Sequence, residues 1–263
     1  MANDYSFVTP GGAASESSAG RYVYCFIEGE VPIDLGNIGI DNLPVRGISD
    51  SGVTALVSNI PYRQMDSNLQ QVMAHQRVVD EARKSESAVV LPVRFGVIIN
   101  GDVGVRKLLQ TSAAKYREKM RQLNHKDEYG VKVLLNKDDL AKFRKGVELE
   151  SRAIQKLRDE IASSANTGRA YFLKMKLQDA IKTETLRRIE SVSSAIHKEL
   201  SSVSDNSAML KSDVSQVILN VSYLVDRSGS LLFEHKVSEL THRFAASGLT
   251  IHKSGPWAPY SFC

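Results

Sequence analysis

The feature of this sequence that most constrains its fold is a helical stretch of roughly 60 residues in the second half of the chain. Asp138 or Asp139 is expected to open it, and it continues to about Leu200 with a break at 163–168. Its second segment carries an apolar stripe, interrupted only by Thr185, that consists of Leu173, Leu177, Ile181, Ile189, Val192, Ile196 and Leu200. This spacing predicts a long amphipathic helix.

Extended segments flank this helical stretch. EYGVKVLLN at 128–136 predicts a strand before it, and a hairpin, a helix and a last strand are predicted after it at 207–212, 216–226, 231–244 and 249–253. The resulting order, β-α-β-β-α-β, is typical of a ferredoxin-like (split βαβ) unit. Because about 15 helical residues would satisfy that motif, we expect residues 138–202 to form a helical insertion that projects from the unit.

The first half of the chain predicts a separate α+β unit. RYVYCFIEG at 21–29 and GVTALVSNIP at 52–61 are rich in aromatic and β-branched residues and predict strands. Between them, repeated glycines and prolines predict turns. Three segments complete the unit: a helix at 67–85 with Ser67 as N-cap, extended structure at 88–99, and a helix capped by Asp102 that runs to Leu123.

These patterns together predict an α+β protein with two domains. Residues 1–20 are expected to be a disordered arm, followed by an α+β domain at 21–125 and a ferredoxin-like domain at 126–253. The arm lacks the basic and apolar regions of a secretory signal, and no apolar run approaches the 18 residues that a membrane span needs. Two cysteines, Cys25 and Cys263, make no disulfide framework, so a cytoplasmic location is predicted.

No catalytic or cofactor motif is recognisable. Glycine-rich phosphate loops are absent, and the six histidines lack metal-ligand spacing, so no cofactor and no metal are predicted. His75, on a predicted helix near the core, and Arg94, alone in an apolar extended run, leave a small-molecule enzyme as one alternative.

Nucleic-acid binding is a second alternative, because ferredoxin-like modules include RNA-binding domains. However, the net charge is only +4, and the strand at 216–226 has one aromatic residue and no basic-glycine lead. The basic cluster at 115–122 is explained as the solvated side of an amphipathic helix. We therefore expect no nucleic-acid partner.

The ending SGPWAPYSFC, residues 254–263, is unusually aromatic for a chain terminus. Two prolines preset an extended backbone and so lower the entropy cost of docking the tail. We predict an interdomain strap that packs between the domains through Pro256, Trp257, Pro259, Tyr260 and Phe262. A docking peptide for another protein and a loose end are the alternatives.

Four segments together resemble the gas vesicle protein F/L family (GvpF/GvpL). They are GRYVYCF at 20–26, the His75 helix leading into VVLPVRFG at 89–96, EYGVKV at 128–133 and the GPWAPYSF ending. The resemblance implies a non-enzymatic accessory or minor structural protein of the gas vesicle, a gas-filled protein shell. It also implies binding to the small, very apolar major shell protein, GvpA, and to other gas vesicle proteins.

The surface that would bind these partners is not marked by a motif. A shell subunit with a large apolar face would aggregate in water unless it were covered. The helical insertion, with the basic residues Lys174, Lys182, Arg187 and Arg188, is our candidate for the partner surface.

Overall fold

The computed structural model describes residues 19–66, 68–84 and 88–263. The expected N-terminal arm and the Ser67 cap therefore lie outside, or largely outside, the described residues. The chain divides into two compact units, one ending at Asn124 and the other running from His125 to Cys263. Both combine helices with sheets, so the predicted α+β class is confirmed.

The first unit is built on an antiparallel sheet with the order β2-β3-β4-β1-β5, in which β6 also pairs with β1. Its strands are β1 (Ala19–Glu28), β2 (Asp34–Gly36), β3 (Val45–Asp50), β4 (Val53–Pro61), β5 (Val90–Pro92) and β6 (Ile98–Asn100). The central strand β1 is buried along most of its length, as its aromatic and β-branched sequence predicts.

The strands β2 and β3 are absent from the sequence prediction, which assigned this stretch to turns. β3 and β4 are joined by Ser51 and Gly52, both with positive φ, and this two-residue connection is a tight hairpin turn. The glycines and prolines that predicted turns thus separate short strands rather than replace them.

Two helices pack against this sheet, α1 (Leu69–Ala82) and α2 (Gly101–Leu123). The predicted Asp102 cap of α2 is wrong. Asn68 caps α1, and Asn100 precedes α2 without a side-chain cap bond. Asp102 instead accepts hydrogen bonds from Arg21 and Arg46, so its carboxylate ties α2 to the strands β1 and β3.

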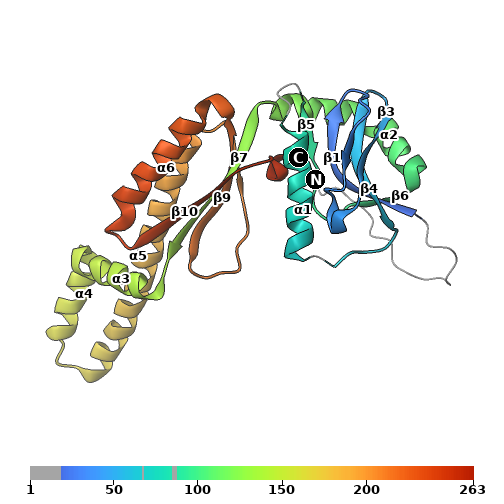
Figure 1. Ribbon diagram of the computed structural model, residues 1–263. Coiled ribbons are helices and arrows are strands. Elements are labelled where there is room, and N and C mark those ends of the chain that lie inside the picture. The colour runs from blue at the N-terminus through green and yellow to red at the C-terminus, as the bar shows by residue number, and fades with distance from the viewer. Residues whose placement is uncertain (1–18, 67, 85–87) are drawn as a thin grey trace, which may run out of the picture. The chain divides into compact units, whose positions relative to one another are not determined.

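The second unit contains the antiparallel sheet β10-β7-β9-β8. Its strands are β7 (Lys126–Leu135), β8 (Asn206–Met209), β9 (Val217–Asp226) and β10 (Leu249–Trp257). The helix α6 (Ser230–Ala245) and the last turns of α5 (Thr167–Ser201) cover one face (Figure 1). Phe233, Tyr129 and Tyr223 meet in the core beneath them. The strands and helices follow one another in the order that the sequence predicts.

The long helical insertion consists of α3 (Lys137–Glu150), α4 (Arg152–Ala162) and the first half of α5. We call residues 137–188 the helical arm. Figure 1 shows it extending beyond the end of the β10-β7-β9-β8 sheet. The predicted break at 163–168 is confirmed, but Asn136, and not Asp138 or Asp139, caps α3. The arm has its own small core of Val147, Ile154 and Ile181, against which Phe143, Leu177 and Ala180 pack.

The C-terminal tail is fastened to the sheet of its own unit. β10 continues to Trp257, opposite Glu128 of β7, and a turn at Tyr260–Phe262 follows. The buried Glu128 carboxylate accepts hydrogen bonds from the Ser222 hydroxyl (2.6 Å), the Ser261 hydroxyl (2.7 Å) and the Ser261 amide (2.8 Å). Because side chains alternate along a strand and Tyr129 faces the helices, Glu128 holds the tail on the opposite face.

A glycine is required where the tail turns. Gly255 has φ +106°, and a Cβ there would lie 2.6 Å from the Glu128 carbonyl oxygen. In the tail, 44% of Trp257 is exposed, whereas Ala258 is fully buried. The packing of the tail between the two domains stays a prediction.

Candidate partner-binding surface

The four basic residues proposed from the sequence all lie on α5, but they differ in their contacts. Arg187 bonds Glu184 on its own helix, at 2.7 and 2.9 Å. Arg188 reaches Glu150 at the end of α3, at 2.5 Å. Lys174 and Lys182 are exposed and have no ion pair with any residue that the structure describes. Of the four proposed basic residues, Lys174 and Lys182 are therefore the two whose charges are not compensated by a described ion pair.

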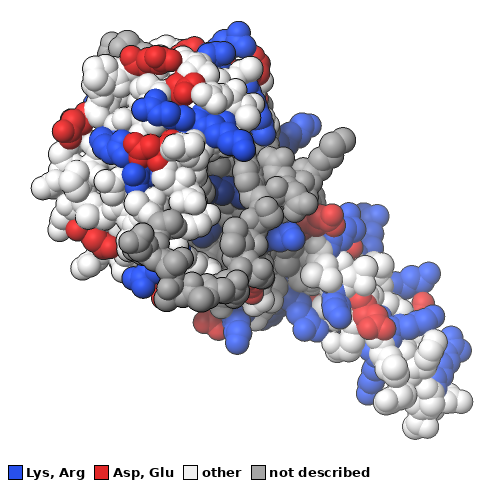
Figure 2. Space-filling view, turned by 90° about the vertical axis from the view of Figure 1, so that its right-hand side faces the viewer, with Lys and Arg blue, Asp and Glu red and all other residues white. Residues whose placement is uncertain are grey.

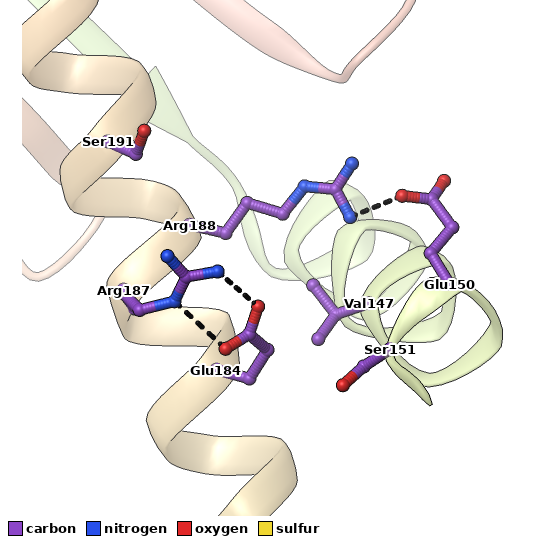
Figure 3. A pocket seen from close by; sticks show the side chains of 7 residues that line it. All are labelled: Val147, Glu150, Ser151, Glu184, Arg187, Arg188 and Ser191. Carbon is purple, nitrogen blue, oxygen red and sulfur yellow. Dashed lines mark hydrogen bonds and ion pairs between the residues drawn. The ribbon is translucent and has the colours of Figure 1, made fainter. Parts of the chain in front are cut away.

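A cavity of about 330 Å³ lies between the end of α3 and α5. It is lined by Val147, Glu150, Ser151, Glu184, Arg187, Arg188 and Ser191. Figure 3 shows the Arg188 side chain crossing it to Glu150, while Arg187 and Glu184 pair on one side. The hydrogen bond from Arg187 holds the pKa of Glu184 below its ordinary value. Because each guanidinium in this cavity already has a carboxylate, the cavity is suited to joining α3 to α5 rather than to holding an anion.

The arm exposes more large apolar side chains than it buries. Four apolar residues of the arm are buried: Val147, Ile154, Leu173 and Ile181. Six large ones are exposed, namely Leu140, Leu149, Tyr171, Phe172, Met175 and Leu186. Single exposed apolar residues are normal on protein surfaces, but a concentration on one small element is typical of an interaction site.

Four of the six exposed residues form a stripe along α5. Tyr171, Met175 and Leu186 are spaced by 4 and 11 residues, so they lie on one helix face, and Phe172 is three residues before Met175. Their exposed fractions are 68% for Tyr171, 56% for Phe172, 53% for Met175 and 57% for Leu186. We call these four residues the outer stripe, because Leu173, Leu177 and Ile181 face the arm core on the opposite side.

The outer stripe was missed by the sequence analysis, which followed only the buried stripe of the same helix. The signal was short, since only Tyr171 and Met175 stand at i and i+4 about half a turn from the buried stripe, and polar residues separate them from Leu186. A helix that packs on one side only would carry polar residues at these positions.

The arm also carries the positive charge of the chain. Residues 137–188 contain thirteen Lys and Arg and eight Asp and Glu, whereas the rest of the chain is almost balanced. Figure 2 shows basic side chains and uncharged side chains side by side on the far end of the arm, with few acidic ones. The exposed surface of the arm is thus both apolar and cationic.

His75 and Arg94, the residues of the enzymatic alternative, lie in different surroundings. His75 is buried and Arg94 is exposed, and among the described residues no hydrogen bond or ion pair joins the two. His75 Nε2 donates to the Val93 carbonyl (3.0 Å), and its Nδ1 accepts from the Tyr22 hydroxyl (2.8 Å). That hydroxyl in turn accepts from the Gly96 amide. Both ring nitrogens are therefore engaged in holding the segment 93–96 to β1.

Burial keeps the His75 imidazole neutral near pH 7. It lowers the pKa of His75 from 6.5 to about 4, and the hydrogen bond with the Val93 carbonyl opposes this only in part. Burial also raises the pKa of Tyr22. The neutral His75 imidazole, bonded to two fixed partners, therefore has a structural role.

The described residues also bear on metal binding and on membrane spans. Within them, no three His, Cys, Asp or Glu side chains converge to form a metal site. None of the helices in the described ranges combines the length and apolarity needed to cross a membrane.

Comparison with known proteins identifies the family of this chain. The model of the family described as "Gas vesicle synthesis protein GvpL/GvpF" matches residues 20–263. Gas vesicle protein F of Nostoc sp. strain PCC 7120 is 25% identical, with 93% of this chain and 98% of the relative covered. Gas vesicle protein F of Streptomyces sp. strain CB03234 is 28% identical, over 88% and 93% of the two chains.

Solved structures show the same fold. The crystal structure of GvpF from Anabaena sp. PCC7120 superposes with a TM-score of 0.77 at 23% identity, covering 93% of this chain and 98% of that one. GvpF from Microcystis aeruginosa superposes with a TM-score of 0.71 at 20% identity, over 92% and 98%. The resemblance inferred from the sequence motifs is confirmed, and the role of the protein is related to gas vesicles. This chain belongs to the GvpL/GvpF family of gas vesicle proteins.

Proposed function

We propose that this protein is an accessory or minor structural component that acts in gas vesicle assembly. It binds the major shell protein GvpA and other gas vesicle proteins and catalyses no reaction. It works in the cytoplasm and at the vesicle. The family match and the names of the relatives support the vesicle context.

The observation that carries the binding role is the apolar excess of the helical arm. Six large apolar side chains are exposed on an element that buries only four apolar residues. A partner that covered them would remove apolar surface from water, which stabilises a complex by about 25 cal/mol for each Å² buried. An apolar shell subunit would gain in the same way, because its own exposed face would be shielded before assembly.

The test is co-expression of the tagged full chain with the major shell protein, followed by affinity purification. We expect the shell protein to be retained. Reversing the two unpaired charges with Lys174→Glu and Lys182→Glu should lower the retained fraction by about tenfold, because each exposed ion pair contributes up to about 1 kcal/mol.

The matched control is Lys211→Glu, which reverses an exposed lysine of the same unit outside the arm. It should retain the shell protein as the unchanged chain does. Failure of the unchanged chain to retain the shell protein at low and physiological ionic strength would contradict the proposed function.

A further inference from the structure

We propose that the outer stripe of α5 is a docking site for one amphipathic helix of a partner protein, with acidic residues along both borders of that helix's apolar face. This inference rests on the proposed function and specifies the chemistry of the partner segment. The outer stripe is the apolar part of the site, and the lysines beside it are the charged part.

The length of the stripe fits a helix of about four turns. Tyr171 and Leu186 are 15 positions apart, which corresponds to about 22 Å along the helix axis. All four apolar residues of the stripe are more than half exposed. Because the opposite side of α5 is occupied by the arm core, the stripe is presented on a helix that is already fixed. A fixed helix reduces the entropy cost of binding.

The charges around the stripe indicate which charge the side chains of a partner helix should carry. Lys174 lies along one border, Lys176 along the other, and Lys182 falls within the stripe between Met175 and Leu186. The Lys176 ammonium sits 5.0 Å from the centre of the Phe172 ring. From Thr167 to Arg188, α5 carries six basic and two acidic side chains. Glutamates or aspartates on the partner helix would therefore meet uncompensated cations on both sides.

The same charges argue against a second copy of this chain as the occupant. Pairing two such helix faces would bring lysines against lysines, and like charges placed together in an interface cost several kcal/mol. Asp179 argues against a lipid surface. It is exposed and lies among the apolar residues of the stripe, where it would enter an apolar and anionic environment. In an interface with a protein helix, one basic residue opposite Asp179 would be enough to compensate its charge.

The experiment uses the full chain and a synthetic probe. The probe is an 18-residue peptide that forms an amphipathic helix with leucines on one face, glutamates along both borders and a fluorescent label. A second peptide has lysines in place of the glutamates. We expect the acidic peptide to bind at least about tenfold more tightly than the basic one, with a preference that weakens as salt is added.

Variants locate the site on the chain. The double variant Tyr171→Ser, Met175→Ser should weaken binding of the acidic peptide by at least about tenfold, because it removes two adjacent apolar contacts. Lys182→Gln should weaken it by about threefold. Leu231→Ser is the matched control, since Leu231 is 79% exposed on α6 of the same unit, and it should leave the affinity unchanged. All four positions are exposed, and circular dichroism verifies that each variant is folded.

Three results would overturn the inference. They are equal affinity for the two peptides, unchanged affinity in the double variant, and binding to phosphatidylglycerol vesicles or self-association that the double variant abolishes without any peptide preference. If the peptides give one of these results while the full chain still retains the shell protein, only this inference is refuted. If the peptide binds as expected and the shell protein is not retained, the proposed function falls instead.

Discussion

Lowering the pH from 6.5 to 4 should destabilise the first unit by about 3 kcal/mol through the single side chain of His75. The pKa of this buried imidazole is lowered to about 4 in the folded protein, whereas an unfolded chain protonates it near 6.5. Between these values the unfolded state binds the additional proton. The contribution of His75 to stability is therefore complete above pH 6.5 and is lost as the pH falls through 4.

Hydrogen exchange of the β1 amides is the appropriate measurement, because it reports on the first unit alone. After correction for the intrinsic pH dependence of exchange, the unchanged chain should lose protection steeply between pH 6.5 and 4. His75→Gln should be less stable at neutral pH and should show a flatter slope. His252→Gln, which removes an exposed histidine of β10, should keep the original slope. Identical slopes for the unchanged chain and His75→Gln would refute the assignment.

Replacing Glu128 with alanine should release the C-terminal tail, at a cost of about 3 kcal/mol. The carboxylate accepts three hydrogen bonds, two of them from Ser261 and one from Ser222. Ser222 is only 2% exposed, so its hydroxyl would lose its acceptor in a buried position. The free energy lost with these hydrogen bonds to one charged group should exceed the free energy of the remaining contacts between the tail and the sheet. The tail should therefore be released.

Trp257 makes this release measurable, because it is the only tryptophan of the chain and lies at the start of the tail. In Glu128→Ala, its fluorescence anisotropy should fall and carboxypeptidase should remove the last residues faster. Glu128→Gln keeps a carbonyl acceptor and should give an intermediate result. Glu160→Ala, on the arm, is the control that should change neither measurement. An unaltered anisotropy in Glu128→Ala would show that other contacts hold the tail.

The sequence predicted the strands and helices wherever a single period extends over many residues. β1, α5 and β9 are examples, because their apolar residues repeat over 10 to 35 residues. The caps were predicted less well. Asp102 has the composition of a cap, but its partners Arg21 and Arg46 are 81 and 56 residues away. A pairing across such a separation leaves no local pattern in the sequence.

The candidate site was predicted in part. The sequence indicated the helical insertion, and Lys174 and Lys182 are exposed there as expected. Arg187 and Arg188 are instead engaged with Glu184 and Glu150, and the second of these pairs depends on the packing of α3 against α5. Which of several similar cations stays uncompensated is decided by tertiary structure, so composition alone could not separate them.

The small core of the helical arm has a consequence for its dynamics. The arm core is a cluster of three buried residues, whereas fifteen buried residues form the core that α5 and α6 share with the sheet. Amide protons of α3 and α4 should therefore exchange through a local opening that leaves the β10-β7-β9-β8 sheet closed. A partner that covers α5 would slow this exchange, so protection factors in α3 and α4 would report occupancy from residues that the partner never touches.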